Sequence, residues 1–124
     1  MSDKSILIIE DNPSNLKLAK VILQKEGYEV LTAEAAEQGL EILKGAHPDM
    51  ILMDLQLPGM DGLQLTSLLK KNPQTQDIII IALTAYAMQG DDLKALSAGC
   101  DGYITKPFDT RTLGTTVKNF FDKT

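Results

Sequence analysis

The sequence predicts a doubly wound α/β fold, with a five-stranded parallel sheet in the strand order 2-1-3-4-5 flanked by five helices. Residues 5–9, 50–53 and 78–83 are short, continuous apolar runs, which are typical of strands buried on both faces. Candidate strands and helices alternate regularly, and this pattern requires right-handed crossovers and a sheet covered on both sides. A length of 124 residues with 44% hydrophobic content fits one domain over residues 1–124.

The first helix has clear start and stop signals. Asn12 is placed as its N-cap and Pro13 as its first residue, because an Asx side chain satisfies free N–H groups and proline needs no donor. The apolar residues of 14–26 fall on one face of a helix, and Gly27 is expected to end it as the C′ residue.

Periodicity and turn residues place the other elements. In the third helix, Leu65, Leu68 and Leu69 are expected to face the core, with Asp61 as N-cap. Gly39 lies inside the second helix, where it costs about 1 kcal/mol relative to alanine and has no reason visible in the sequence. The remaining predicted elements are an edge strand at 28–32, helices at 35–44, 62–71 and 90–98, a strand at 102–105, and a last helix capped by Asp109.

Composition excludes several classes of function. A net charge of −5 argues against sequence-independent nucleic-acid binding, which requires a basic surface. We expect a cytoplasmic protein, because the sequence has no membrane-spanning apolar run and no signal-peptide pattern. Cys100 and His47 are the only residues of their types, which excludes an internal disulfide, a zinc site and a Cys/His nucleophile. Cys100 is expected to be a small buried filler.

Acidic residues follow two of the predicted strands. Glu10 and Asp11 follow the first strand and Asp54 the third, and the order 2-1-3-4-5 places these two strand ends side by side at the switch point, where ligands bind. Three converging carboxylates repel one another unless a cation is present, and all-oxygen ligands suit Mg²⁺. The next two strand ends carry Thr84 and Lys106.

This set of groups favours phosphoryl transfer to a carboxylate. Asp54 can act as the nucleophile, while a divalent cation, the ammonium of Lys106 and the hydroxyl of Thr84 stabilise the added negative charge. Taken singly, each residue has an ordinary structural role, as a solvated strand end, a turn or a cap. Their joint occurrence at four strand ends is what indicates a functional site.

With these residues, the chain resembles the receiver domains of two-component response regulators, the CheY-like superfamily, over essentially its full length. Residues 10–15 and 84–91 are most similar to single-domain DivK-type regulators and to the receivers of hybrid histidine kinases. The resemblance rests on Glu10-Asp11, on Asp54 and the loop at 57–62, on Thr84-Ala85, and on Lys106-Pro107.

The resemblance implies a phosphorylated, Mg²⁺-binding site. Asp54 is the expected phosphoacceptor. A sensor histidine kinase or a histidine phosphotransfer protein is the expected donor of the phosphoryl group. Asp11, Asp54 and the backbone carbonyl of Gln56 are the expected Mg²⁺ ligands, with Glu10 acting through water. No enzyme activity is expected beyond Mg²⁺-dependent self-phosphorylation and autodephosphorylation.

The resemblance also implies a switch. Lys106 pairs with the phosphoryl group. The peptide bond between Lys106 and Pro107 would be cis. Ala85 is small, so it leaves the phosphoryl pocket open. Thr84 moves toward the phosphoryl oxygens, and Tyr103 turns into the space that Thr84 leaves. The surface formed by the fourth helix, last strand and last helix then changes, and a downstream effector protein or kinase reads it.

Three alternatives use related folds or sites. A flavodoxin-like electron carrier would need a phosphate-binding loop where the acidic pair Glu10-Asp11 stands. A haloacid-dehalogenase-like phosphatase would carry Asp-x-Asp, whereas this chain has Asp54-Leu55-Gln56. An unphosphorylated pseudo-receiver scaffold is disfavoured because every site residue is present. A chain from Met1 to a polar end at Thr124 suggests a stand-alone regulator that works through protein contacts, as a monomer or a phosphorylation-dependent dimer, without nucleic-acid or membrane binding.

Overall fold

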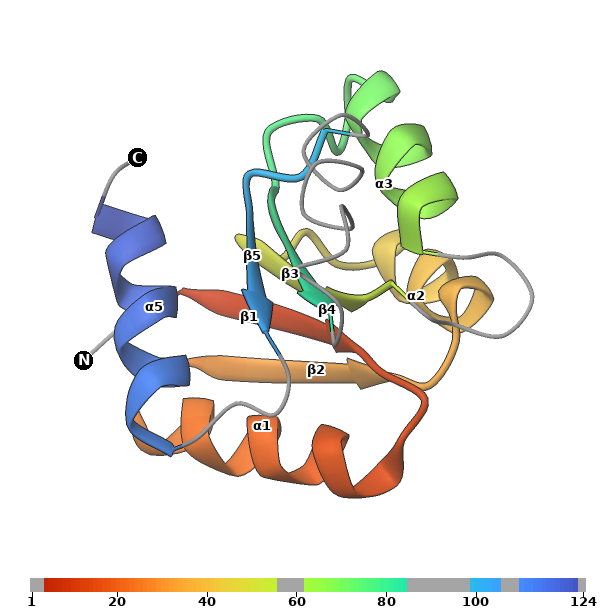
Figure 1. Ribbon diagram of the computed structural model, residues 1–124. Coiled ribbons are helices and arrows are strands. Elements are labelled where there is room, and N and C mark those ends of the chain that lie inside the picture. Colours follow the sequence, from red (N-terminus) through yellow and green to blue (C-terminus); the bar gives the residue numbers. More distant parts are fainter. Residues whose placement is uncertain (1–3, 56–61, 85–98, 106–109, 123–124) are drawn as a thin grey trace.

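The computed structural model of the chain describes residues 4–55, 62–84, 99–105 and 110–122. Five parallel strands form one sheet in the order β2-β1-β3-β4-β5, which confirms the predicted fold class and strand order (Figure 1). The strands are β1 (Ser5–Ile9), β2 (Glu29–Ala33), β3 (Met50–Asp54), β4 (Ile79–Thr84) and β5 (Gly102–Thr105). The described helices are α1 (Pro13–Lys25), α2 (Ala36–Leu43), α3 (Gly62–Lys71) and α5 (Thr110–Asp122). The helix expected at 90–98 lies outside the described residues.

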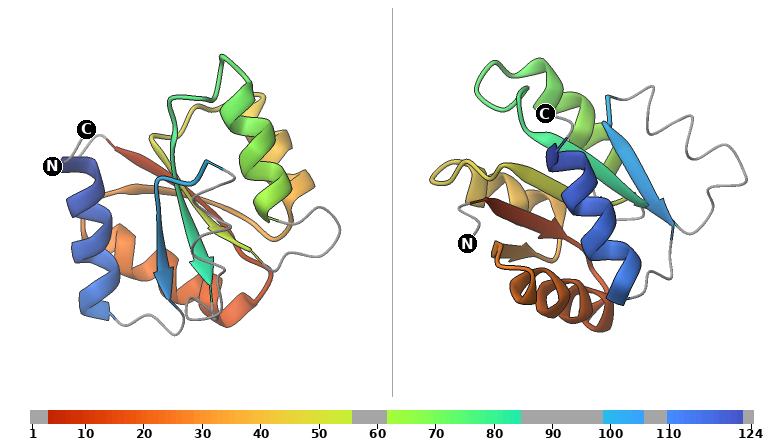
Figure 2. Two further views of the ribbon diagram at one scale, coloured as in Figure 1. Left: turned by 45° about the horizontal axis from the view of Figure 1, so that its top comes forward. Right: turned by 90° about the vertical axis from the view of Figure 1, so that its left-hand side faces the viewer.

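Helices cover both faces of the sheet (Figure 2). Alternate residues of the central strands point to opposite sides, so Ile6 and Ile8 of β1 pack with α1 and α5, while Leu7 and Ile9 pack with α2 and α3. This double burial explains why the central strands read as unbroken apolar runs. No helix within the described ranges is both long and apolar enough to cross a membrane.

The ends of α1 confirm the predicted caps. The Asn12 side chain accepts hydrogen bonds from the backbone N–H groups of Ser14 and Asn15, at 2.9 and 3.1 Å. Pro13 is the first helical residue. At the other end, Gly27 has a φ of 96°, and the N–H groups of residues 27 and 28 bond back to the carbonyls of residues 24 and 23. This is a Schellman motif, which places glycine where a side chain would be strained.

Gly39 is explained by the approach of α2 to the sheet. A Cβ atom at this position would lie 2.6 Å from Cδ1 of Ile9 on β1. The glycine therefore lets α2 lie directly on the sheet, which offsets its low helix propensity.

One predicted core residue of α3 is at the surface. Leu68 is 50% exposed, whereas Leu65 and Leu69 are buried as predicted. The buried face of α3 instead continues through Gly62 and Thr66, on the other side of Leu65. Leu68 and Thr66 are two residues apart, which places them about 200° apart around the helix, so one face of α3 cannot hold both. The expected caps Asp61 and Asp109 lie outside the described residues.

Carboxylates hold the strand starts together at the amino-terminal edge of the sheet. Asp49 accepts a hydrogen bond from the backbone N–H of Ser5 at 2.9 Å. Asp101 accepts one from the N–H of Ile80 at 2.8 Å and one from Nζ of Lys70 at 3.0 Å. Each of these acids therefore meets a donor or a cation.

Candidate functional site at the carboxyl edge of the sheet

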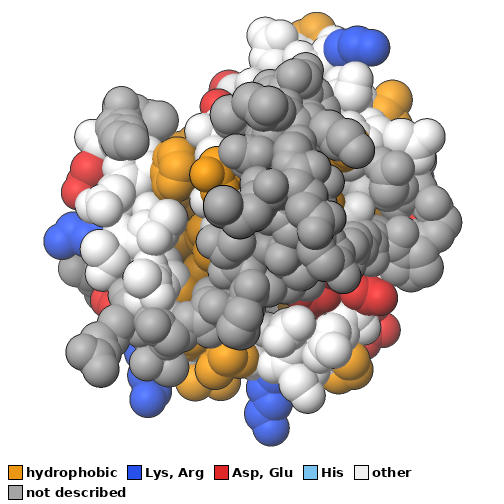
Figure 3. Space-filling view, in the orientation of Figure 1, with side chains coloured by type: hydrophobic (Ala, Val, Ile, Leu, Met, Phe, Trp, Pro, Cys, Tyr) orange, Lys and Arg blue, Asp and Glu red, His pale blue; other side chains and the backbone are white. Residues whose placement is uncertain are grey.

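The predicted acidic residues come together at the carboxyl ends of two neighbouring strands. Asp54 is the last residue of β3, and Glu10 and Asp11 follow β1 directly. These strands pair in parallel with Ile9 opposite Met53, so the residues after them emerge side by side. Acidic side chains gather at the lower right of the face in Figure 3, on the side where β1 and β2 end.

The three carboxylates share one small volume. Each of Glu10, Asp11 and Asp54 places an oxygen within 4.8 Å of the others. Glu10 and Asp54 are only 1% and 3% exposed, whereas Asp11 is exposed. The backbone N–H of Asn12 donates to Oε2 of Glu10 at 3.2 Å, which fixes one side of the cluster. Like charges at this spacing are stabilised by a cation placed among them.

The donor set fits a hard divalent cation. All three groups offer carboxylate oxygens, and one of them is open to solvent and to water ligands. Mg²⁺ favours this arrangement, because it binds one or two carboxylates and keeps several waters. The cluster is therefore compatible with Mg²⁺ binding.

The remaining predicted residues divide into two groups. Thr84 ends β4, the strand beside β3, so its backbone lies at the same edge of the sheet as Asp54. Tyr103 lies in β5 opposite Ala82, and its side chain is 39% exposed. The positions of Gln56, Ala85, Lys106 and Pro107 lie outside the described residues.

Gly62, which the sequence analysis used only as part of the loop at 57–62, lies directly against Asp54, and Thr66, which it did not include, contacts Gly62 and Met53. A Cβ atom on Gly62 would be 2.6 Å from the backbone oxygen of Asp54, so the first residue of α3 touches the end of β3. Thr66, one turn later, is fully buried and donates its hydroxyl to the carbonyl of Gly62 at 2.8 Å. In the sequence, Gly62 ends the loop that carries the resemblance, whereas Thr66 is marked by no more than being a polar residue beside the apolar stripe of α3.

Cys100 is a buried residue outside the acidic cluster, which confirms its predicted role as a small filler. Burial raises the pKa of its thiol, which keeps it protonated. Its Sγ lies 3.6 Å from the hydroxyl of Thr66.

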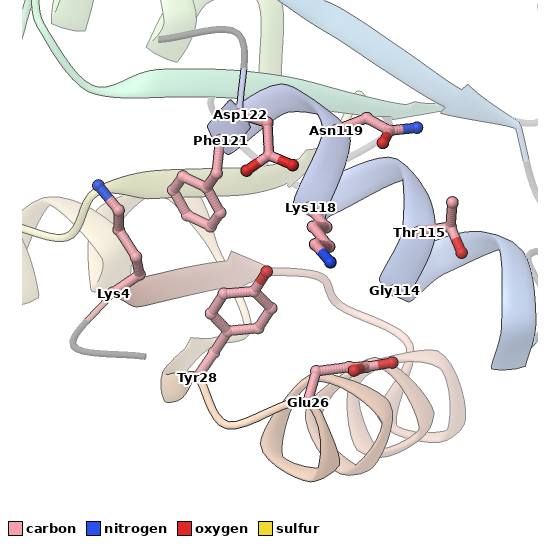
Figure 4. Close-up of a pocket in the computed structure, with 9 residues that line it drawn as sticks. All are labelled: Lys4, Glu26, Tyr28, Gly114, Thr115, Lys118, Asn119, Phe121 and Asp122. Carbon is pink, nitrogen blue, oxygen red and sulfur yellow. The ribbon is translucent and has the colours of Figure 1, made fainter. Parts of the chain in front are cut away.

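A cleft of about 730 Å³ lies at the opposite edge of the sheet (Figure 4). Lys4 comes before β1 and Tyr28 before β2, so the cleft is at the amino ends of these strands. Burial, together with the charges of Glu26 and Asp122, raises the pKa of the Tyr28 hydroxyl. None of the predicted site residues that the structure describes lines this cleft.

Comparison with known proteins decides the family. The model of the response regulator receiver domain matches residues 6–118. The chain belongs to this family. A receiver domain of a response regulator acts as a phosphorylation-dependent signalling switch in a two-component system, and this function applies here. Family membership also separates the chain from the electron carriers and phosphatases considered above.

Several relatives match this receiver domain over nearly their full length. The polar-differentiation response regulator DivK of Brucella ovis is 38% identical over 117 residues, covering 94% of this chain and 95% of DivK. A CheY-like receiver domain protein from Methanospirillum hungatei superposes with a TM-score of 0.89 at 35% identity, covering 98% of this chain and 96% of that one. The receiver domain of a sensor histidine kinase from Pseudomonas aeruginosa, with magnesium coordinated in its active-site cleft, gives a TM-score of 0.88 at 33% identity, covering 98% and 99%.

These relatives confirm the predicted similarity to DivK-type regulators and to kinase receivers. Receiver domains take phosphoryl groups from histidine kinases and bind Mg²⁺ at their acidic site. The acidic cluster of Glu10, Asp11 and Asp54 is the part of the described structure that suits this chemistry.

Proposed function

We propose that this receiver domain accepts a phosphoryl group on Asp54 from a phosphohistidine, carried by a histidine kinase or a histidine phosphotransfer protein. The observation that carries the proposal is the convergence of Glu10, Asp11 and Asp54 within 4.8 Å at the ends of β1 and β3. Asp54 is almost fully buried, as Glu10 is, but it alone of the three is part of a central strand, β3, which it ends. A carboxylate held in this way has a fixed orientation toward an incoming phosphorus atom.

Asp11, Asp54 and the backbone carbonyl of Gln56 would hold Mg²⁺, with Glu10 acting through a water molecule. When bound, the ion supplies positive charge that neutralises the carboxylates and the transferred phosphoryl oxygens. The carboxylate cluster supports this assignment, as does the magnesium coordinated in the Pseudomonas aeruginosa receiver.

In the transfer step, the phosphoryl group passes from the donor histidine to Asp54. A carboxylate oxygen of Asp54 attacks phosphorus, the O–P bond forms, and the P–N bond breaks as imidazole leaves. Lys106 pairs with the transferred oxygens, Thr84 donates to one of them, and Ala85 and Pro107 border the pocket. Attack of water on phosphorus later releases inorganic phosphate and restores the carboxylate, so the chain modifies itself and turns over no separate substrate.

The output would be a change of surface around Tyr103. Phosphorylation adds about −1.5 to −2 charges and three acceptor oxygens, which draw Thr84 inward. Tyr103 is 39% exposed, so its ring is in a position to exchange a solvent-facing arrangement for an inward one. This is a shift between two packings, biased by the phosphoryl group. We expect Tyr103→Ala to leave phosphorylation nearly unchanged and to weaken binding of a partner that prefers the phosphorylated form.

The same proposal covers organisation and partners. Residues 1–124 would form a single receiver domain in the cytoplasm, where kinases draw on ATP, and its output would be a contact with an effector protein or kinase. Phosphorylation would either leave the domain monomeric or drive its dimerisation.

Equal partner affinity before and after Tyr103→Ala would contradict the switch.

Phosphotransfer from a protein donor tests the function. A histidine kinase labelled on its histidine with [γ-³²P]ATP is mixed with wild type and with Asp54→Asn. We expect Mg²⁺-dependent label on the wild type only, as an acyl phosphate that hydroxylamine removes. Borohydride reduction followed by peptide mapping should convert residue 54, and no other carboxylate, to homoserine. Label on a different residue would contradict the proposal.

A further inference from the structure

We infer that Gly62 and Thr66 are positioning residues, which set the place of the phosphoacceptor by fixing the distance between the start of α3 and the Asp54–Leu55 peptide. This inference deepens the proposed function and rests on it. The acidic cluster consists of Glu10, Asp11 and Asp54, and neither residue belongs to it. Their effect is through the backbone of Asp54.

The contact at Gly62 is between backbones. A Cβ atom here would lie 2.6 Å from the Asp54 oxygen, 3.0 Å from Cα of Leu55 and 3.3 Å from the Asp54 carbonyl carbon. None of these atoms is the end of a flexible side chain, so a larger residue must move a strand or a helix. The φ of Gly62 is not positive, so the constraint is space and not backbone conformation.

The end of β3 is held firmly on its other side. The N–H of Leu55 donates to the carbonyl of Leu83 on β4 at 3.1 Å, and Asp54 pairs with Leu83 in the sheet register. A displaced Asp54 carbonyl cannot shift freely into β4, so the Asp54–Leu55 peptide must rotate or α3 must retreat. Either movement displaces the main chain at Asp54, and the carboxylate that it carries then shifts relative to Glu10 and Asp11.

Thr66 holds the start of α3 in this position. Its hydroxyl carries one proton and donates it to the Gly62 carbonyl, at 2.8 Å. The same oxygen lies 3.6 Å from Sγ of Cys100 and 3.7 Å from Sδ of Met53, the residue before Asp54. Because the hydroxyl proton is used, the thiol of Cys100 is the donor in their contact. Thr66 therefore touches both the helix start and the strand that carries the phosphoacceptor.

Other glycines of the chain provide matched controls. Gly45 has no atom within 4 Å of its missing Cβ, so Gly45→Ala should change nothing. At Gly39 the nearest atom is Cδ1 of Ile9, at 2.6 Å, which is the flexible end of a side chain. Gly39→Ala thus introduces an equally close contact without touching the backbone of Asp54.

The first readout is chemical. We expect Gly62→Ala to slow acetyl phosphate-driven acyl phosphate formation at saturating Mg²⁺ by roughly 10- to 100-fold, the scale expected for small misplacements of a reacting group. Gly45→Ala and Gly39→Ala should stay within about twofold of wild type, even where melting temperature falls in Gly39→Ala. A Gly62→Ala rate no lower than that of Gly39→Ala would overturn the inference.

The second readout needs no phosphoryl transfer and no metal. Backbone ¹³C′ and ¹⁵N resonances of Asp54 and Leu55 should shift in Gly62→Ala and stay in place in Gly45→Ala. Unchanged Asp54 and Leu55 resonances in Gly62→Ala would overturn the inference. If the wild type forms no acyl phosphate, the proposed function fails, and this readout still decides the role of Gly62.

Thr66 offers a pair of variants that keep the fold. Thr66→Ser retains the hydroxyl and should stay within about twofold of the wild-type rate, whereas Thr66→Val retains the shape and should be severalfold slower. If Gly62→Ala fails to fold, this pair carries the test. Equal rates for Thr66→Ser and Thr66→Val would contradict the positioning role.

Discussion

Acidic side chains lie at both edges of the sheet, but their surroundings differ. At the amino edge, Asp49 and Asp101 each accept a backbone N–H, and Asp101 also meets the ammonium of Lys70 at 3.0 Å. At the carboxyl edge, Glu10 also accepts a backbone N–H, from Asn12, but the carboxylates of Glu10, Asp11 and Asp54 lie within 4.8 Å of one another. Carboxylates that accept hydrogen bonds from donors stabilise the fold. Carboxylates that face one another in a small volume repel, and a bound cation relieves this repulsion. The clustering of carboxylates therefore distinguishes the carboxyl edge, where we propose the site.

The largest effect on stability should come from adding Mg²⁺. A ligand that binds only the folded state at about 100 times its dissociation constant stabilises that state by about 2.7 kcal/mol. We expect this shift in urea unfolding of the wild type, measured against the same ionic strength of Na⁺. It should vanish in Asp54→Asn and persist in Asp101→Ala. A shift of equal size in Asp54→Asn would mean that the ion binds elsewhere.

Removing a matched carboxylate should be the next largest effect. Asp101→Ala leaves the N–H of Ile80 without its acceptor and Lys70 without its partner. Since the Asp101 side chain is 42% exposed, water offsets part of the loss, and we expect a decrease of about 1–2 kcal/mol in urea unfolding. Phosphoryl uptake should stay within about twofold of wild type. A stability equal to wild type would contradict the structural role assigned to the amino edge.

Removing a carboxylate that faces other carboxylates should change the free energy of unfolding in the opposite direction. In metal-free buffer, Asp54→Asn relieves repulsion with Glu10 and Asp11 and should raise the free energy of unfolding by on the order of 1 kcal/mol. Asp101→Ala, run beside it, should fall. If both variants lose stability, the acidic cluster is not strained by its charge.

The smallest effect should be at an exposed pair. His47 Nε2 lies 3.2 Å from Oδ1 of Asp77, but the two side chains are 52% and 68% exposed. Such a pair contributes little, so His47→Ala should change the free energy of unfolding by less than about 0.5 kcal/mol. A larger loss would show that this more exposed pair matters as much as Asp101 does.

The sequence predicted the sheet and the acidic cluster because both follow from local patterns. Unbroken apolar runs define the central strands, and parallel topology alone then brings the residues after β1 and β3 together. The caps at Asn12 and Gly27 were equally local, since each depends only on residues within one turn. The bounds of the described elements agree with the predictions to within one residue.

What the sequence could not supply depends on distances between elements. Gly39 and Gly62 have their reasons in Ile9 and Asp54, which lie on other elements and become neighbours only in the fold. Leu68 was wrongly placed in the core, because periodicity alone does not tell that the buried face of α3 runs through Thr66, on the side of Leu65 away from Leu68. A buried hydroxyl is compatible with the core only once its acceptor, the Gly62 carbonyl, is known.

Intact mass after incubation with acetyl phosphate tests the central claim most directly. Wild type and Asp54→Ala are each measured with and without Mg²⁺, and Asp101→Ala serves as the matched carboxylate variant from the other edge. We predict a gain of one phosphoryl group in wild type and Asp101→Ala, only with Mg²⁺, and none in Asp54→Ala. A gain that survives Asp54→Ala would contradict the account, because the chemistry would then belong to a different residue.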